Sequence, residues 1–488
     1  MKFRPLKLLP LAMALAAVPM FAHGEDLLDA YHQAVANSPV LAQQLAQRNI
    51  TGENVPLAWA PLLPHLSAGL ELQQFNGGAT TLGTGGTAAG TAGSVAPTAS
   101  IGHTRRRTES ITLTQTILDF SKYANLSAAK ASRDSANALY QANLDDLMVR
   151  VTQAYFNVLT SKDQVQFAKA NVDALKRQYE QAEQRFKVGL SAITDVQDAK
   201  ASYDSALANL YVARNELHDA REALTQITGH PTEHLDVLVD ELPMAPPSPS
   251  NLSTWVTQAK LNNPNILAQQ FNVEAADHSV TAARDARLPT INANVSYGKT
   301  ATWYENNFPG RRDPGSASIG LTLSVPLFSG GAIHANISKS IYQRDAAQAA
   351  LVQQRRQVVR NTRNYYRSVI SGISQVNAAK QAVVSSKSAL KATQAGFLVG
   401  TQTIVNVLLA QEKLTQARQQ YSLARHQLIL NKLLLKQAAG ALQVQDLKLV
   451  NALLKPASAV QDFPANMEDG AGDNPLPAAP ATSGNATG

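Results

Sequence analysis

The chain has 488 residues, of which 44% are hydrophobic but only 6% aromatic, and its formal net charge is +7. Because it contains no cysteine, disulfides, cysteine nucleophiles and thiolate metal sites are excluded. The positive charge is too mild to indicate nucleic-acid binding, and no phosphate-binding loop, nucleophile elbow or dinucleotide fingerprint indicates an enzyme.

The first residues predict a secretory signal peptide. Three basic residues precede the apolar run Leu8–Phe21, and small residues follow it. We therefore expect residues 1–24 to be removed before Glu25 and the mature chain to be exported. An uncleaved anchor helix is the alternative, but the run is shorter than the ~20 residues that a membrane span needs.

An internal repeat covers nearly all of the mature chain. Residues 25–242 form a first unit, a Pro-rich linker follows at 243–250, and residues 251–456 form a second unit. The clearest match pairs FKVGLSAITDV at Phe186–Val196 with FLVGTQTIVNV at Phe397–Val407. We therefore expect both units to contain the same elements in the same order.

Each unit is predicted to begin with two helices, the first starting near Asp26 or Ser253, and to end with a long helical hairpin. The hairpins are expected at 121–229 and 332–440, since these stretches contain few helix breakers. The expected interruptions are Gly189 in the first hairpin and Gly372, Gly396 and Gly400 in the second. A continuous helix up to the first break would be about 100 Å long. Such helices need partners along their length, in a coiled coil or bundle.

Two β-hairpins are predicted inside the units, near 65–118 and 290–327. Their strands alternate apolar with small polar residues over His65–Phe75, Thr108–Leu118, Thr290–Lys299 and Ser318–Leu327. This alternation is typical of outer-membrane barrels, although a water-soluble sheet with one wet face alternates in the same way. Four strands are too few to close a barrel, and lipid does not tolerate an open edge. If the strands span a membrane, several chains must pool their hairpins.

The hairpin loops are expected at Asn76–His103 and Ala301–Gly315, and both have a composition that an outer surface tolerates. Three aromatic residues of the second loop fit an interfacial belt: Trp303, Tyr304 and Phe308. The run Arg105–Arg107 is interpreted either as a solvated loop cluster or as a lipopolysaccharide contact. Residues 457–488 are rich in Pro, Ala and Gly and are expected to form a disordered tail.

One motif raises the question of metal chemistry. Residues His230–His234 read H-x-x-E-H, an order found in some zinc peptidases. That chemistry needs both histidines on one helical face, whereas Gly229 and Pro231 indicate a helix end. We therefore expect no metal, no cofactor and no enzymatic activity.

Six segments together are more specific than any single motif: APLLPHL at 60–66, AYFNVL at 154–159, QRFKVGLSAITDVQDAKASYD at 184–204, QITG at 226–229, VPLFSGG at 325–331 and GTQTIVNVL at 400–408. Through them the chain resembles the TolC-like outer-membrane channels, the exit ducts of tripartite efflux pumps and type I secretion systems. The resemblance covers about Glu25 to Pro456. It implies a mixed α and β fold, in which a homotrimer shares one twelve-stranded transmembrane β-barrel, four strands per chain, continuous with a long periplasmic α-helical barrel.

The resemblance also implies a location and partners. The duct would sit in outer-membrane lipid, extend into the periplasm and reach an inner-membrane transporter through a periplasmic adaptor, with no nucleic-acid partner. Multidrug efflux and type I protein secretion both fit. The adaptor would meet the two hairpin tips, at Val188, Gly189, Leu190, Val399, Gly400 and Thr401.

A periplasmic gate near the second tip is implied as well, but this chain departs from the family pattern there. Where other members carry a Tyr, an Arg and two Asp residues, it has Phe397, Gln402, Asn406 and Leu409. The first-half partners of the gate remain as Gln178, Thr194 and Asp195. Neutral hydrogen bonds are weaker than charge-assisted ones, and rings without carboxylates do not hold multivalent cations. We therefore expect a looser, less cation-selective constriction, closed by apolar contact at Leu409 and Phe397.

A competing hypothesis comes from a different functional class. A periplasmic coiled-coil adaptor or structural protein, without a membrane-spanning barrel, would also contain long helices and a β-region. An adaptor's β-region should show compact globular alternation rather than a pair of matched hairpins. The two matched hairpins therefore favour the channel.

Overall fold

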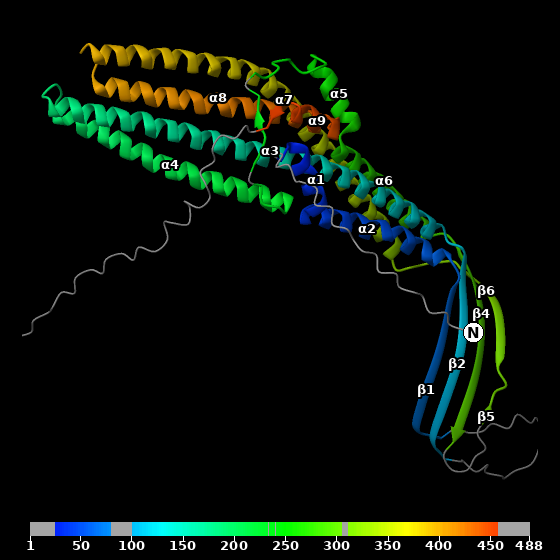
Figure 1. Ribbon diagram of the computed structural model, residues 1–488. Helices are drawn as coiled ribbons and strands as arrows, with labels where there is room; N and C mark the ends of the chain where they lie inside the picture. Colours follow the sequence, from blue (N-terminus) through cyan, green and yellow to red (C-terminus); the bar gives the residue numbers. More distant parts are fainter. Residues whose placement is uncertain (1–24, 80–99, 233, 240, 305–310, 457–488) are drawn as a thin grey trace, which may run out of the picture.

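The computed structural model describes residues 25–79, 100–232, 234–239, 241–304 and 311–456. The expected signal peptide at 1–24, the expected tail at 457–488 and Phe308 lie outside these ranges. Figure 1 shows an elongated, curved molecule with long helical hairpins at one end and a sheet at the other.

Most of the described chain is helical, and its helices fall in two halves. The first half contains α1 (Leu27–Asn37), α2 (Pro39–Trp59), the short 3-10 helix η1 (Ala60–Leu62), α3 (Phe120–Lys187) and α4 (Ile193–Thr228). The second half contains α5 (Leu252–Asn262), α6 (Pro264–Asp285), α7 (Ala332–Leu398), α8 (Ile404–Ala438) and α9 (Val444–Asn451). Residues 243–250, between the halves, form neither helix nor strand.

The helices begin where the sequence offers side-chain caps. The Asp119 carboxylate accepts hydrogen bonds from the backbone N–H groups of Ser121, at 3.1 Å, and Lys122, at 3.4 Å, at the start of α3. Asn263 caps α6 in the same way, and Pro264 follows it in the first helical turn, where a missing N–H costs nothing.

Two of the expected interruptions in the second hairpin are absent, because Gly372 and Gly396 lie inside α7. Gly372 is buried, and a Cβ there would lie 3.2 Å from Cδ1 of Leu428, so glycine lets α8 pack closely. Gly396 gives room to the side chain of Gln402, whose Cγ would lie 2.7 Å from an added Cβ. Close packing, rather than a break, explains these two glycines.

The sheet is antiparallel, and its main strands follow the order β1 (His65–Ala79), β2 (Ser100–Leu118), β4 (Thr290–Tyr304) and β6 (Ser316–Ser324). The short β5 (Arg311–Arg312) also pairs with β4, and β3 (Val237–Leu238) pairs separately with β7 (Leu454–Lys455). The ladder continues beyond the predicted strand ends, so Arg105–Arg107 and Trp303 lie in strands and not in loops. Conversely, β6 ends at Ser324, three residues before the predicted end at Leu327.

The strand register collects the apolar residues on one face. Leu66 lies opposite Leu113, Leu113 opposite Val295, and Val295 opposite Ile319. The next residues along each strand form a polar row on the other face: Ser67, Thr112, Ser296 and Ser318. Alternation in the sequence therefore becomes one apolar and one polar face of a single sheet.

The described part of the molecule is an open layer with two free sides. Among the described strands, β1 pairs only with β2, and β6 pairs only with β4. Among the long helices, α3 contacts α2, α4, α6 and α8, whereas α7 packs on α6, α8 and α5. The side formed by β1, α2 and α4 and the side formed by β6 and α7 are therefore left without a neighbour along their length (Figure 1).

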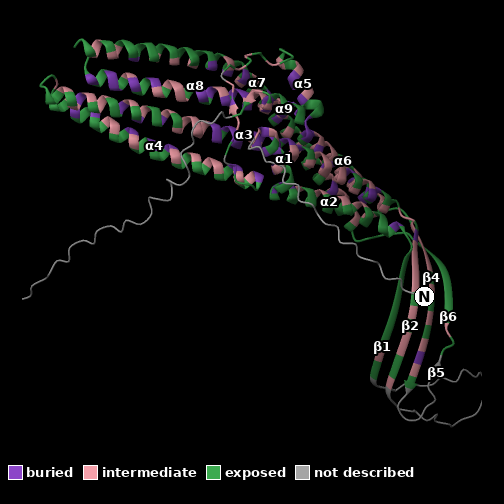
Figure 2. Ribbon diagram, viewed as in Figure 1, coloured by how far each residue is buried: buried purple, intermediate pink, exposed green. Residues whose placement is uncertain are grey.

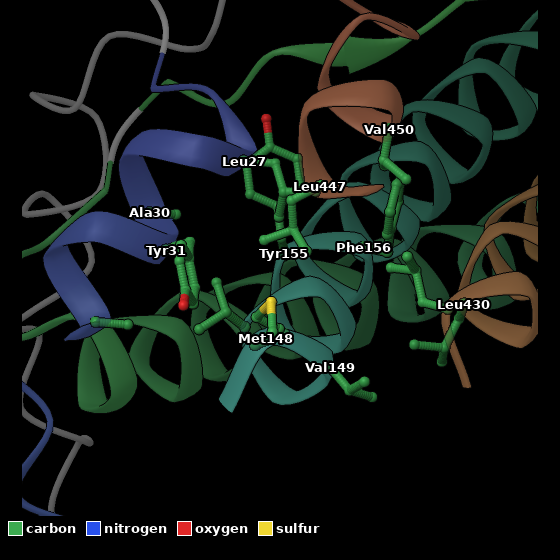
Figure 3. Close-up of a cluster of buried hydrophobic side chains, with 14 of the residues drawn as sticks. Leu27, Ala30, Tyr31, Met148, Val149, Tyr155, Phe156, Leu430, Leu447 and Val450 are labelled. Carbon is green, nitrogen blue, oxygen red and sulfur yellow. The ribbon is translucent and has the colours of Figure 1, made fainter. Parts of the chain in front are cut away.

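The main hydrophobic core lies in the middle of the helical part, where α1, α3, α8 and α9 meet (Figure 3). Tyr155 is fully buried there, with its hydroxyl 3.1 Å from the carbonyl oxygen of Glu25 and 3.0 Å from that of Asp236. Figure 2 shows that burial is concentrated in the helices and is sparse in the sheet. Among the described helices, none combines the length and hydrophobicity needed to cross a membrane.

Candidate functional site at the helical hairpin tips

Both long hairpins reverse through the same backbone turn. After α3, Gly189 has φ +74°, its N–H donates to the carbonyl of Phe186 at 2.9 Å, and the N–H of Leu190 donates to Arg185 at 2.8 Å. After α7, Gly400 has φ +80° and repeats this pair of bonds with the next residue. This is a Schellman turn, which needs a left-handed residue at the position that glycine occupies in both tips.

The tips present apolar side chains to solvent. Val188 and Leu190 are 68% and 69% exposed in the first tip, and Leu398 and Val399 are 63% and 76% exposed in the second. Exposed apolar residues that cluster at one end of a molecule mark a contact surface. The residues expected to contact an adaptor thus lie together at one end of the molecule (Figure 1).

Phe397 joins the two tips. The guanidinium of Arg185, in the last turn of α3, lies 4.9 Å from the centre of the Phe397 ring. The ring also packs on the apolar clusters that hold Ile404 and Val407 in the first turn of α8. Arg185 was not singled out from the sequence, because the periodicity of one helix says nothing about an aromatic partner in another. This cation–π contact holds the two hairpins together near their ends.

Two gate candidates, Asn406 and Leu409, lie on an exposed face of α8, and a third, Gln402, lies just before the helix begins. The amide Nδ2 of Asn406 donates to Oε1 of Gln402 at 2.7 Å, and both residues are exposed. Leu409 follows one turn later and is 49% exposed. Polar side chains therefore precede an apolar one along a surface that no other described element covers.

The first-half candidates lie nearby but do not bond to this face. Thr194 is exposed and Asp195 half-buried in the first turn of α4, while Gln178 is half-buried on α3. The Gln178 Oε1 atom is buried without a hydrogen-bond partner among the described residues. Within one chain, Gln402 takes its hydrogen bond from Asn406, and no bond within the described ranges connects it to Asp195.

Above the tips, a line of polar contacts joins α3 to α8. Both the Gln411 amide and the Thr415 hydroxyl donate to Oδ1 of Asn171 at 3.1 Å. Further along, Ser422 donates to the carboxylate of Asp163. These contacts fix the register of one hairpin against the other, because each joins residues more than 200 positions apart in the sequence.

His426 extends this line and is buried beside Phe156, with ring centres 5.3 Å apart. Its Nδ1 lies 2.8 Å from the hydroxyl of Thr160, which itself donates to the carbonyl of Phe156. Burial lowers the pKa of His426 to about 4, with a further contribution from Arg425. Burial also raises the pKa of Asp163. The seam between the hairpins thus buries two titratable groups, His426 and Asp163, and burial disfavours the charged form of each.

The H-x-x-E-H motif does not form a helical metal site. Helix α4 ends at Thr228, so His230 and His234 lie in the following irregular segment, and Glu233 is outside the described residues. Elsewhere in the described part of the chain, no group of three or more acidic or histidine side chains is placed to hold a metal ion.

Comparison with known proteins gives a consistent result. A family model described as "Outer membrane efflux protein" matches residues 30–230 and 255–441. Outer membrane protein TolC of Escherichia coli (strain K12) is 34% identical over 468 residues, which is 93% of this chain and 90% of that protein.

Two more distant similarities extend this comparison. The alkaline protease secretion protein AprF of Pseudomonas aeruginosa is 25% identical and covers 87% of this chain and 86% of its own length. The crystal structure of the Campylobacter jejuni CmeC outer membrane channel superimposes with a TM-score of 0.71 at 15% identity, over 88% of this chain and 90% of that one. The last comparison bears on the fold alone.

Proposed function

This chain belongs to the outer membrane efflux protein family, and from that premise we propose that three copies assemble into one exit duct. The duct is an outer-membrane protein that conducts efflux or type I secretion substrates out of the cell. Each copy contributes four strands to a shared twelve-stranded barrel and its long helices to a periplasmic tunnel. The two halves of the chain are structural repeats within this assembly.

The open layer with an apolar sheet face carries this proposal. An unpaired strand edge is costly in lipid, because its backbone groups have no partner. The unpaired edges of β1 and β6 lie at opposite ends of the strand order. In the helical part, α2 and α4 lie at one edge of the layer and α7 lies at the other. Joining one side of a copy to the other side of the next is a head-to-tail contact, which closes into a ring if the rotation permits.

Aromatic residues support the placement of the sheet in a membrane. Trp59, Phe120 and Phe328 are exposed at the junction between sheet and helices, and Trp303 is exposed near the other end of β4. Bands of aromatic residues at both edges of an apolar surface are typical of outer-membrane barrels. The apolar face would contact lipid, and the polar face would line the channel.

Charges on the free helical sides are complementary. On α7, five arginines line one groove together with Lys260 of α5: Arg355, Arg356, Arg360, Arg363 and Arg367. On α4, Glu216, Asp219 and Glu222 are exposed. Ring closure would bring the basic side of one copy near the acidic side of the next, which favours this order of assembly.

The purified protein should behave as a membrane-embedded trimer. We expect detergent-extracted protein to show three chains by native mass spectrometry and to form conducting pores in planar bilayers, because only the assembled barrel seals the strand edges. Boiling should convert the slow-migrating form to monomer on gels. A detergent-independent soluble monomer without pore activity would contradict the proposal.

We assign the tips to a periplasmic adaptor and, through it, to an inner-membrane transporter. Six tips would form a ring at the inner end of the tunnel, each with a Schellman turn and exposed apolar residues. The matching family model is named for efflux, and the relative AprF is named for protease secretion. Both kinds of cargo therefore remain compatible with the tube, and neither requires catalysis by the chain.

The gate is formed by Gln402, just before α8, and by Asn406 and Leu409 on the exposed face of α8. Its other members are Phe397 and the first-half residues Gln178, Thr194 and Asp195. The Asn406–Gln402 bond supports a constriction lined by neutral amides and Leu409. Neutral side chains give a weaker lock and little attraction for multivalent cations.

Cation block tests this gate in the same bilayer preparation. We expect hexamminecobalt(III), added on the periplasmic side, to leave the single-channel conductance of the wild-type pore nearly unchanged. The double variant Asn406→Asp/Leu409→Asp should become at least tenfold more sensitive, because it adds two carboxylates per chain to the constriction. The variant Glu274→Gln, which changes an exposed carboxylate on α6 outside the gate and outside the charged helical sides, serves as the control. Strong block of the wild-type pore would contradict a neutral constriction.

A further inference from the structure

Arginine and lysine side chains gather at the outer end of the apolar sheet face. On the face that carries the Ile111–Tyr297 pair, the next cross-strand pair toward the outer end of the sheet is Glu109–Lys299. The pair after it on this face is Arg107–Ala301. The row after that pairs Arg105 with Trp303. Because side chains alternate between faces, all of these residues lie on the same face as Leu113 and Val295.

The neighbouring arginine points the other way. Arg106 lies in the row of Gln73 and Thr302, on the polar face, and its guanidinium is 5.7 Å from the centre of the Phe75 ring. Three consecutive arginines are therefore divided between two faces, two on the apolar side and one on the polar side. This division arises because the arginines lie in the paired strand β2. Arginines in a solvated loop would not be divided between two faces.

The cluster has a net positive charge and free donors. Arg105 and Lys299 are exposed, and Arg107 is half-buried with its guanidinium 6.0 Å from the Trp303 ring. Glu109 forms an ion pair with Arg107 at 3.0 Å, so three cations face one carboxylate. An arginine has five N–H donors, and one exposed ion pair leaves several for another anion.

The height of the cluster fits the headgroup region of a bilayer. With about 3.4 Å of rise per residue and a strand tilt of about 40°, the stretch of β2 from Leu118 to Arg107 climbs about 28 Å. The apolar band of an outer-membrane barrel is about 25 Å tall. If the sheet lies in the membrane as proposed above, Arg105 and Arg107 lie just beyond the hydrocarbon, where phosphate groups are located. Lys299, level with Glu109, lies at the edge of the hydrocarbon, and its long side chain reaches toward the same phosphate groups.

We propose that Arg105, Arg107 and Lys299 bind the phosphate groups of an outer-leaflet lipid, with Trp303 beside Arg107 in the same headgroup region. Guanidinium groups bind phosphate through two parallel hydrogen bonds, and the low dielectric beside the acyl chains strengthens these bonds. The site rests on the proposed barrel, since it requires the apolar face to meet lipid. Each chain contributes one such site.

The test compares lipids that differ only in phosphate. Purified trimer is incubated with bis-phosphorylated lipid A or with the same lipid A after enzymatic removal of its phosphates, and retained lipid is counted by native mass spectrometry. We expect the wild type to retain at least fivefold more of the phosphorylated form. The variant Arg105→Gln/Arg107→Gln should lose this preference, whereas Arg106→Gln, from the same strand but the opposite face, should keep it.

The outcomes separate this site from the duct itself. Equal retention of both lipids by wild-type trimer, or an equal loss in Arg106→Gln, would overturn the lipid site while leaving the trimer intact. Full displacement of the lipid by 50 mM inorganic phosphate would indicate a site for free anions and would also overturn it. Failure to obtain a trimer at all would instead count against the proposed duct. Bilayer conductance of each variant confirms that the barrel has assembled.

Discussion

Replacing Gly440 by Ala should destabilise the protein by about 3 kcal/mol per chain and sharply lower the yield of assembled protein. Gly440 ends α8 with φ +66°. An added Cβ would lie 2.5 Å from the carbonyl carbon of Asn262 and 2.8 Å from the nitrogen of Asn263. A left-handed non-glycine residue costs about 1–2 kcal/mol, and overpacking against rigid backbone adds about 1–3 kcal/mol.

The close approach at Gly440 joins two segments that are distant in the sequence. The buried Asn263 amide donates to the carbonyl of Ala438 at 3.0 Å, so the end of α8 and the junction of α5 with α6 hold each other in place. An alanine at 440 would push them apart and break that bond.

The measurement is the thermal loss of helical circular dichroism, together with the amount of heat-modifiable trimer in outer membranes. The control is Gly331→Ala, because Gly331 also has a positive φ, of +85°, but no atom lies within 4 Å of its added Cβ. We expect Gly331→Ala to lower the stability only by the cost of the left-handed backbone conformation, about 1–2 kcal/mol. Equal effects of the two substitutions would show that the close approach at Asn262 is unimportant.

The seam between the hairpins should be labile to acid because of His426. Its pKa is about 4 in the folded chain, below the ordinary value of 6.5, since burial disfavours the charged ring. The stability that neutral His426 contributes is therefore present above pH 6.5 and is lost as the pH falls toward 4. Between pH 7 and pH 5 this loss is about 2 kcal/mol per chain.

Other buried groups act in the opposite direction. Burial raises the pKa of Asp145 to about 6 and also raises that of Asp163, so both carboxyl groups favour folding more as the pH falls. The pH dependence of the wild type alone is thus a sum of opposing effects. A difference between variants isolates the histidine.

The variant His426→Gln keeps a polar side chain beside Thr160 but cannot titrate. Its stability should fall by about 2 kcal/mol less than that of the wild type between pH 7 and pH 5, measured by urea unfolding of the trimer at each pH. The matched variant His334→Gln alters an exposed histidine at the start of α7 and should follow the wild type. Parallel pH profiles for wild type and His426→Gln would rule out this account.

Much of the secondary structure was readable from the sequence. Long stretches without Gly or Pro predicted the hairpins, and the two hairpin ends fell at Gly189 and Gly400, since a Schellman turn selects glycine locally. Strand alternation also predicted one apolar and one polar face. In both cases the relevant interactions act between residues close in the chain, so the pattern carries the information.

Other features depended on contacts between distant segments. The sequence predicts breaks at Gly372 and Gly396, but packing against Leu428 and Gln402 keeps both inside α7. The sequence also predicts one cluster at Arg105–Arg107, whereas pairing with β1 and β4 divides the arginines between two faces.

The sequence by itself therefore determined which stretches form the long helices and the alternating strands, where the long helices turn, and which family the chain resembles. Only the tertiary structure decided that Arg185 lies against Phe397 and that His426 is buried at the seam between the hairpins. The reason is physical: periodicity and turn propensity are set by neighbours within a few residues. Burial, pKa and the choice of partner are set instead by segments that folding brings together from more than 200 residues away.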